Sequence, residues 1–133
     1  MRAMEDTINV LHIDDEPIFL QVTKQYLNAL AGNELKIYSL SNPLEVFKEL
    51  KEKDIDVIVI DYKMPEMNGL ELLEELRNTK ENVPVIIFTG QGREEVAITA
   101  LNLGADYYIE KGGDPKSQYS ELAHIIWSGI TRK

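Results

Sequence analysis

Residues 55–70 read I-D-V-I-V-I-D-Y-K-M-P-E-M-N-G-L, and this stretch decides the fold. The β-branched apolar run at 57–60 is typical of a parallel strand that is buried on both faces. Asp61 follows it directly, at the end of the strand where open α/β sheets bind their ligands. An Asp in this position is more often a turn residue or a helix cap, so its role has to be judged from the rest of the chain.

Composition describes a soluble globular protein of 133 residues, 44% hydrophobic and 28% charged. We predict one domain over 1–133, with a core over about 7–131. The chain has no cysteine, which excludes disulfides and thiolate metal sites. Its apolar runs are too short to span a bilayer and its first residues do not resemble a signal peptide, so we expect a cytoplasmic protein without membrane contact. The net charge of −9 argues against direct nucleic-acid binding and is compatible with a divalent cation.

Apolar stretches alternate with amphipathic ones along the whole chain. Strands are expected at 7–13, 35–40, 57–60, 83–89 and 106–110, with a helix after each of them. This alternation predicts an α/β, doubly wound (βα)5 domain, in which a five-stranded parallel sheet has helices on both faces. The second strand ends in Ser39-Leu40-Ser41, which offers no reactive group, and we expect it at the outside of the sheet.

Several of the expected helices carry start signals. Asp15 is expected to cap the first helix, with Pro17 in its first turn. Residues 42–45 and 68–71 both have the Asn-x-x-Glu spacing of a capping box. The apolar residues at helical spacing are Ile18, Val22, Tyr26 and Leu30 in the first helix, Leu44, Phe47 and Leu50 in the second, and Leu70, Leu73 and Leu76 in the third.

Polar side chains follow four of the five strands. Asp14 and Asp15 come after the first strand, Asp61 after the third, Thr89 after the fourth and Lys111 after the fifth. In a parallel sheet these positions share one edge. Each residue alone has a simpler role as a cap, a strand end or a surface charge, but complementary groups at four strand ends favour a common site.

This set of side chains is suited to phosphoryl chemistry. Crowded carboxylates repel one another, and a divalent cation such as Mg²⁺ removes that cost while leaving room for phosphate. A carboxylate can attack phosphorus and become an aspartyl phosphate. A lysine ammonium and a threonine hydroxyl can bind the phosphoryl oxygens. We therefore interpret Asp61 as a nucleophile that accepts a phosphoryl group, with the other polar residues serving it.

These residues resemble the receiver domain of two-component response regulators. The match rests on Asp14-Asp15, on D-Y-K-M-P-E-M-N-G starting at Asp61, on Thr89-Gly90, and on Tyr108 three positions before Lys111. The resemblance covers essentially the whole chain and implies a flavodoxin-like fold with strand order 2-1-3-4-5. It also implies that Asp61 takes phosphate from the phosphohistidine of a sensor histidine kinase or phosphotransfer protein. The domain would catalyse its own phosphorylation and dephosphorylation without being a multiple-turnover enzyme on small substrates.

The resemblance assigns the metal ligands and the phosphoryl ligands. It implies that Asp15 and Asp61 bind Mg²⁺ (or Mn²⁺), that Asp14 acts directly or through water, and that the backbone carbonyl of Lys63 is a further ligand. By the same resemblance Lys111 binds the phosphoryl group together with Thr89.

A conformational switch is implied as well, in which Thr89 and Tyr108 carry the signal outward past the loop Gly90-Gln91-Gly92. The affected surface would be formed by the fourth helix, the fifth strand and the fifth helix, and would bind an output domain or a second copy. It is expected to include Val96, Ala100, Tyr107 and the start of the last helix.

The loop after Lys111 departs from the family pattern. The family usually has Pro directly after this lysine, whereas this chain has Gly112-Gly113, and Pro115 comes later. The K-G-G-D-P stretch resembles receivers of multidomain sensory kinases of archaea. That weaker resemblance implies that the chain is one piece of a longer protein.

Two alternatives remain from the residues. A phosphohydrolase of the haloacid dehalogenase type also uses an aspartyl nucleophile, but it places a second Asp two residues later, where this chain has Lys63. A flavin-binding flavodoxin-like module would need a phosphate-binding Ser/Thr/Gly loop after the first strand, and none is present. His12 and His124 are read as a strand residue and a surface helix residue, and Trp127 as partial packing.

Overall fold

The computed structural model describes residues 7–90 and 94–131 of the chain. The strands are β1 (Ile8–Ile13), β2 (Leu35–Leu40), β3 (Val57–Ile60), β4 (Val85–Thr89) and β5 (Tyr107–Glu110). The α-helices are α1 (Pro17–Ala31), α2 (Val46–Glu52), α3 (Gly69–Asn78), α4 (Glu94–Asn102) and α5 (Pro115–Thr131). Two short 3₁₀ helices, η1 (Gly32–Glu34) and η2 (Pro43–Glu45), lie between α1 and β2 and before α2. None of the helices within these residues has the length and apolar character that a membrane crossing needs.

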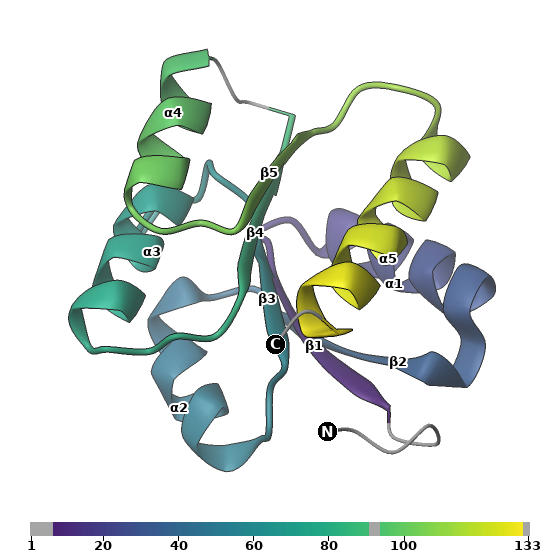
Figure 1. Ribbon diagram of the computed structural model, residues 1–133, viewed down its shortest axis with the longest axis horizontal. Helices are drawn as coiled ribbons and strands as arrows, with labels where there is room; N and C mark the ends of the chain where they lie inside the picture. The colour runs from purple at the N-terminus through teal and green to yellow at the C-terminus, as the bar shows by residue number, and fades with distance from the viewer. Residues whose placement is uncertain (1–6, 91–93, 132–133) are drawn as a thin grey trace.

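All five strands form one parallel sheet in the order β2-β1-β3-β4-β5. The predicted order and the predicted edge position of the second strand are both confirmed. Helices α2, α3 and α4 cover one face of the sheet, and α1 and α5 cover the other (Figure 1). With this strand order, right-handed crossovers decide which face each helix covers, because a helix lies on one face when the chain moves one way along the sheet and on the other face when it reverses.

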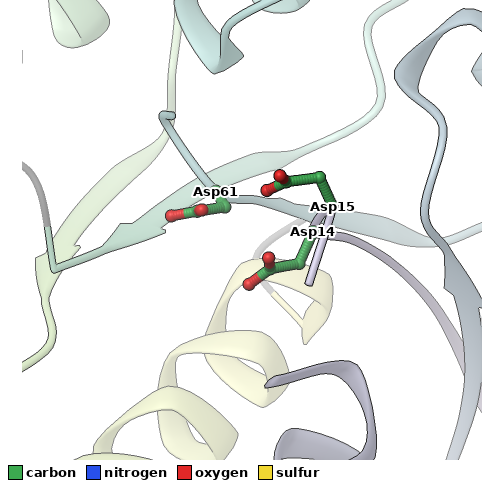
Figure 2. Close-up of side chains that lie close together, drawn as sticks. All are labelled: Asp14, Asp15 and Asp61. Atoms are coloured by element: carbon green, nitrogen blue, oxygen red, sulfur yellow. The ribbon is translucent and has the colours of Figure 1, made fainter. Parts of the chain in front are cut away.

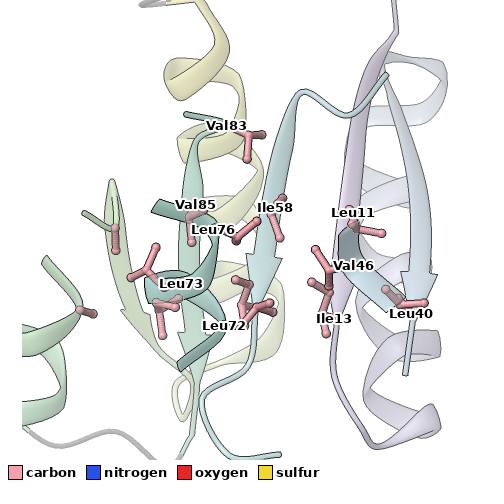
Figure 3. Close-up of a cluster of buried hydrophobic side chains, with 14 of the residues drawn as sticks. Leu11, Ile13, Leu40, Val46, Ile58, Leu72, Leu73, Leu76, Val83 and Val85 are labelled. Atoms are coloured by element: carbon pink, nitrogen blue, oxygen red, sulfur yellow. The ribbon is translucent and has the colours of Figure 1, made fainter. Parts of the chain in front are cut away.

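Each face of the sheet has its own hydrophobic core. On one face Val46 of α2 and the leucines of α3 pack against Leu11, Ile13, Ile58 and Ile60 (Figure 3). On the other face Leu27 of α1 and Tyr119, Leu122 and Ile126 of α5 pack against the alternate residues of the same strands. Because β3 contributes to both cores, all four of its residues are buried, as the apolar run at 57–60 predicted.

The start of α1 differs from the prediction. Its N-cap is Glu16, and no side chain caps it within the described residues. Asp14, not Asp15, bonds the local backbone, because its Oδ1 accepts the N–H of Glu16 at 3.0 Å. The predicted cap at Asp15 is therefore wrong. Pro17 does occupy the first turn, as predicted.

The buried stripe of α1 also differs from the apolar spacing in the sequence. Ile18 is 64% exposed and Leu30 41% exposed, whereas Leu20, Thr23 and Leu27 are buried. Thr23 can occupy a buried position because its hydroxyl hydrogen-bonds the hydroxyl of Tyr119 on α5, 2.9 Å away. The stripe that faces the sheet thus includes a polar residue that apolar periodicity does not detect.

Of the two predicted capping boxes, one is confirmed and one is wrong. Asn68 and Glu71 exchange both hydrogen bonds at the start of α3, each at 2.9 Å. Asn42 instead caps the 3₁₀ helix η2, where its side chain accepts the N–H of Leu44 at 3.0 Å. Helix α2 starts only at Val46, and Leu44, which was expected on its apolar face, is 59% exposed.

Candidate functional site

The register of the sheet brings the reactive strand ends together. Ile13 of β1 is paired with Ile60 of β3, so Asp14 and Asp61 leave the sheet at the same level. The backbone fixes Asp61, because its N–H donates to the carbonyl of Ile13 at 3.0 Å. Figure 2 shows the carboxyl groups of Asp14, Asp15 and Asp61 gathered at these two neighbouring strand ends.

The three aspartates form a cluster with the donor set of a divalent cation site. One carboxylate oxygen from each lies within 4.8 Å of the others. Asp14 is fully buried and Asp61 is 8% exposed, while Asp15 is half-buried. Burial raises the pKa of Asp14 above its ordinary value, and the charge of Asp61 raises it further against the opposing effects of the Glu16 N–H and Lys111. Hard oxygen ligands held together at such a cost fit Mg²⁺ or Mn²⁺.

Lys111 directly follows the edge strand β5, and its side chain extends along the carboxyl edge of the sheet to this cluster. Its backbone N–H donates to the carbonyl of Thr89 at 2.9 Å, which continues the pairing of β4 with β5. Its ammonium Nζ lies 3.4 Å from Oδ2 of Asp14. The same ammonium lies 4.8 Å from the ring centroid of Phe19 and 5.1 Å from that of Phe88. These two aromatic contacts could not be predicted from the sequence, because no spacing along the chain links α1, β4 and Lys111.

The surroundings of Asp61 act in opposite directions on the pKa of its carboxyl group. Burial raises the pKa of its carboxyl above the ordinary value, whereas Lys111, the Thr89 side chain and the N–H of Tyr62 act to lower it. Thr89 is fully buried at the end of β4. The positive charge and the donors therefore compensate part of the cost of keeping the carboxylate ionised, which is the form that can act as a nucleophile.

The turn after Asp61 requires a glycine at position 69. A Cβ on Gly69 would lie 2.5 Å from the backbone oxygen of Asp61 and 3.0 Å from Cα of Tyr62. The N–H of Gly69 donates to the carbonyl of Tyr62 at 2.7 Å. The start of α3 thus lies directly against the backbone of the proposed nucleophile. The Asn68-Gly69 pair signals a helix start in the sequence, but it does not reveal this contact.

Two predicted residues lie at the margin of the site. Lys63 is exposed in the loop after β3, and its backbone carbonyl as a metal ligand stays a prediction. Tyr108 is half-buried on β5, and within the described residues its hydroxyl is buried without a hydrogen-bond partner. Gln91 and Gly92 of the predicted mobile loop lie outside the described residues, and Gly90 before them is exposed.

The sheet order and the acidic edge define a class of protein: a flavodoxin-like α/β domain with an acidic site at the carboxyl ends of its central strands. Comparison with known families makes this specific. The model of the response regulator receiver domain family matches residues 10–122, and the chain belongs to that family. It is a receiver domain of the two-component type, and such domains are signalling domains.

Curated relatives agree with this assignment. A chemotaxis protein CheY homolog of Campylobacter jejuni is 31% identical over 92% of this chain and 95% of its own length. The response regulator SaeR of Staphylococcus aureus is 32% identical over 89% of this chain, but the match spans only 50% of SaeR.

Solved structures agree as well. The receiver domain of the Francisella response regulator 1452 superimposes with a TM-score of 0.82 at 28% identity, covering 95% of this chain and 98% of that chain. A receiver domain protein from Clostridium thermocellum superimposes with a TM-score of 0.79 at 31% identity, covering 94% and 95%. The family match favours a receiver over the phosphohydrolase and the flavin-binding module.

Proposed function

We propose that Asp61 accepts a phosphoryl group from the phosphohistidine of a sensor histidine kinase or phosphotransfer protein. A carboxylate oxygen of Asp61 forms a bond to phosphorus as the phosphorus–nitrogen bond of the phosphohistidine breaks, and the imidazole leaves with the electron pair. The observation that carries this proposal is the convergence of three carboxylates within 4.8 Å, with the Lys111 ammonium 3.4 Å from Asp14. This chain also has Lys63 where a phosphohydrolase of the alternative type would need a second Asp.

Each residue of the site has a proposed part in the transfer. Asp14, Asp15 and Asp61, with the backbone carbonyl of Lys63, would hold Mg²⁺ or Mn²⁺. When bound, the cation supplies charge neutralisation for the approaching phosphoryl group. Lys111 and Thr89 bind the phosphoryl oxygens, Lys111 by its charge and Thr89 by its hydroxyl.

The domain would signal by a switch that couples Thr89 to Tyr108. Phosphorylation draws the Thr89 hydroxyl inward and vacates space that Tyr108 can enter. The buried Tyr108 hydroxyl supports this step, because a hydroxyl without a partner is destabilising and gains from a move to a partner. The responding surface is α4-β5-α5, with Ile98 (53% exposed) and Leu101 (52% exposed) as its apolar contacts on α4. Ala100, expected on this surface, is fully buried and cannot take part.

An output domain or a second copy of the chain would bind this surface. Affinity for that partner is then set by the population of the switched state. From the membership of the receiver family we also propose that the domain works in the cytoplasm and is not a multiple-turnover enzyme on small substrates.

Phosphorylation with acetyl phosphate and Mg²⁺, with the site mapped by mass spectrometry, tests the proposal. We expect one added phosphoryl group on Asp61 and none in Asp61→Asn, whose amide is nearly isosteric but a poor nucleophile. Removal of Mg²⁺ with a chelator should stop the reaction. Phosphate gained by Asp61→Asn at the wild-type rate, or found on another residue, would contradict the assignment.

Metal binding is tested separately. We expect Mg²⁺ affinity of about millimolar, because few protein ligands bind the ion and several waters stay on it. Asp15→Ala should weaken this affinity strongly, and unchanged binding in a titration of that variant would remove Asp15 from the site. The exposed Asp54, in the loop before β3 at the opposite end of the strands, provides the control in Asp54→Ala, which should bind Mg²⁺ as the wild type does.

A further inference from the structure

The backbone on both sides of Lys111 is bonded by one side chain, that of Gln118. The side-chain amide of Gln118 donates from Nε2 to the carbonyl of Glu110, the residue before Lys111. Its Oε1 accepts the N–H of Gly112, the residue after Lys111, at 3.0 Å. Together with the bond from the Lys111 N–H to the carbonyl of Thr89, these contacts fix three consecutive residues.

This chain needs such a brace because the loop itself is not stiff. Gly112 has a φ of 140°, a conformation that L side chains rarely adopt and that proline cannot reach. Gly113 follows it, so two of the three residues between Lys111 and α5 have no side chain. For both glycines, no atom of the described residues other than their chain neighbours lies within 4 Å of the position where a Cβ would be, so those residues do not pack against the loop there. The orientation of Lys111 therefore depends on hydrogen bonds from elsewhere.

Gln118 is itself held in place by the start of α5. Asp114 accepts from the N–H and the hydroxyl of Ser117 through Oδ2, each at 3.1 Å. The backbone carbonyl of Asp114 accepts the N–H of Gln118 at 2.9 Å. Asp114 thus bonds the first turn of α5 through both its side chain and its backbone. This turn places the Gln118 amide against the end of β5.

We propose that Gln118 is a positioning residue for Lys111, which sets the direction in which the ammonium of Lys111 approaches the phosphoryl site. The inference rests on the proposed function of Lys111 as a phosphoryl ligand. Gln118 touches neither the aspartates nor the phosphoryl group in this scheme, and acts only through the lysine backbone. A displacement of α5 at the signalling surface would therefore change the position of the Lys111 backbone.

Gln118→Met is the first variant, because Met has a similar length and is a good helix former but makes neither hydrogen bond. We expect phosphorylation of Asp61 by acetyl phosphate to slow by about five- to tenfold, the loss typical of one or two neutral hydrogen bonds. The amide of Gly112 should exchange with solvent faster, because it has lost its acceptor. Gln25→Met, an exposed glutamine on α1, is the matched control and should behave as the wild type does.

A double-mutant cycle separates positioning from general stability. In a Lys111→Met background, Gln118→Met should cause no further slowing, because the ammonium that the braced backbone would orient is then absent. Gln118→Glu is the second variant: it keeps the acceptor for Gly112 and loses the donor to Glu110. It should slow phosphorylation while the Gly112 amide stays protected.

The outcomes are distinct. If the wild type gains no phosphate at Asp61, the proposed function fails. If the wild type is phosphorylated but Gln118→Met reacts at the same rate, the positioning role is wrong. If Gln118→Met slows the reaction equally with and without the Lys111 side chain, its effect does not pass through Lys111, and the inference is overturned.

Discussion

Replacing Gly69 by Ala tests how closely α3 approaches the backbone of Asp61. The added methyl would lie 2.5 Å from the Asp61 oxygen, whereas relaxed carbon–oxygen contacts are about 3.3 Å or longer. Helix start and strand end would have to separate by roughly 0.8 Å, the difference between those two distances. Overpacking of this kind costs about 1–3 kcal/mol, and the better helix propensity of Ala returns at most about 1 kcal/mol.

We therefore expect Gly69→Ala to be destabilised by about 1–2 kcal/mol, the balance of those two terms. For a chain of this length that corresponds to a melting temperature lower by about 3–8 °C. The same displacement moves the Asp61 carboxylate. A shift near 1 Å can cost about a hundredfold in rate, so phosphorylation by acetyl phosphate should fall at least about tenfold.

Differential scanning calorimetry and the mass-spectrometric phosphorylation assay measure the two effects on one sample. Gly113→Ala is the control, because no atom of the described residues other than its chain neighbours lies within 4 Å of a Cβ there, and the residue does not have a positive φ. It should melt at the wild-type temperature or slightly above. A Gly69→Ala variant that melts and reacts as the wild type does would refute the close approach of α3 to Asp61.

Three further predictions concern residues outside the acidic cluster. Arg77 donates to the backbone carbonyls of three residues between α3 and β5. Arg77→Met should therefore lower the free energy of unfolding by about 2–3 kcal/mol, measured by urea titration. A loss below about 0.5 kcal/mol would contradict this. Tyr119→Phe should cost about 1–2 kcal/mol because it leaves the buried Thr23 hydroxyl unpaired, and adding Thr23→Val should recover part of that loss. His12 is buried, and burial, with the charge of Lys111, lowers its pKa from 6.5 to about 3. Between these two pKa values the unfolded chain binds a proton that the folded chain does not. The contribution of His12 to the free energy of unfolding is therefore complete above pH 6.5, and it falls by up to about 1.4 kcal/mol per pH unit on acidification toward pH 3. His12→Leu should flatten that slope, measured by urea unfolding across the pH range.

The strands and helices could be predicted from the sequence because β-branched runs and start signals at helices are local features, whereas the full strand order was implied by the resemblance to receiver domains. The same locality explains the errors in α1. Ile18 and Leu30 have the spacing of a buried face, but the helix rotates to place Thr23 against Tyr119, 96 residues away in the chain. Asp15 is a residue type that commonly caps helices, yet it is Asp14 whose side chain accepts the backbone N–H of Glu16. Contacts that depend on distant partners left no periodic signal.

The predicted site shows the same division. The strand ends that carry Asp14, Asp61 and Lys111 could be found from sequence, since a parallel sheet sends all of them to one edge. Gln118 could not, because a glutamine in the first turn of a helix has no distinctive pattern. Its contacts with the backbone on both sides of Lys111 became visible only once α5 was placed beside β5.

Lys111 combines a fixed backbone with a loosely held ammonium. Its neighbours in the chain are bonded by Gln118 and its own N–H by Thr89, so the position of its Cα is set. Its Nζ, in contrast, lies 3.4 Å from Asp14, well beyond the roughly 2.7–2.9 Å of a strong charge-assisted hydrogen bond. The rings of Phe19 and Phe88 stabilise the charge without a directional bond. In the proposed reaction the ammonium can therefore turn from Asp14 to a phosphoryl oxygen on Asp61 without breaking a strong contact, while the braced backbone keeps it within reach.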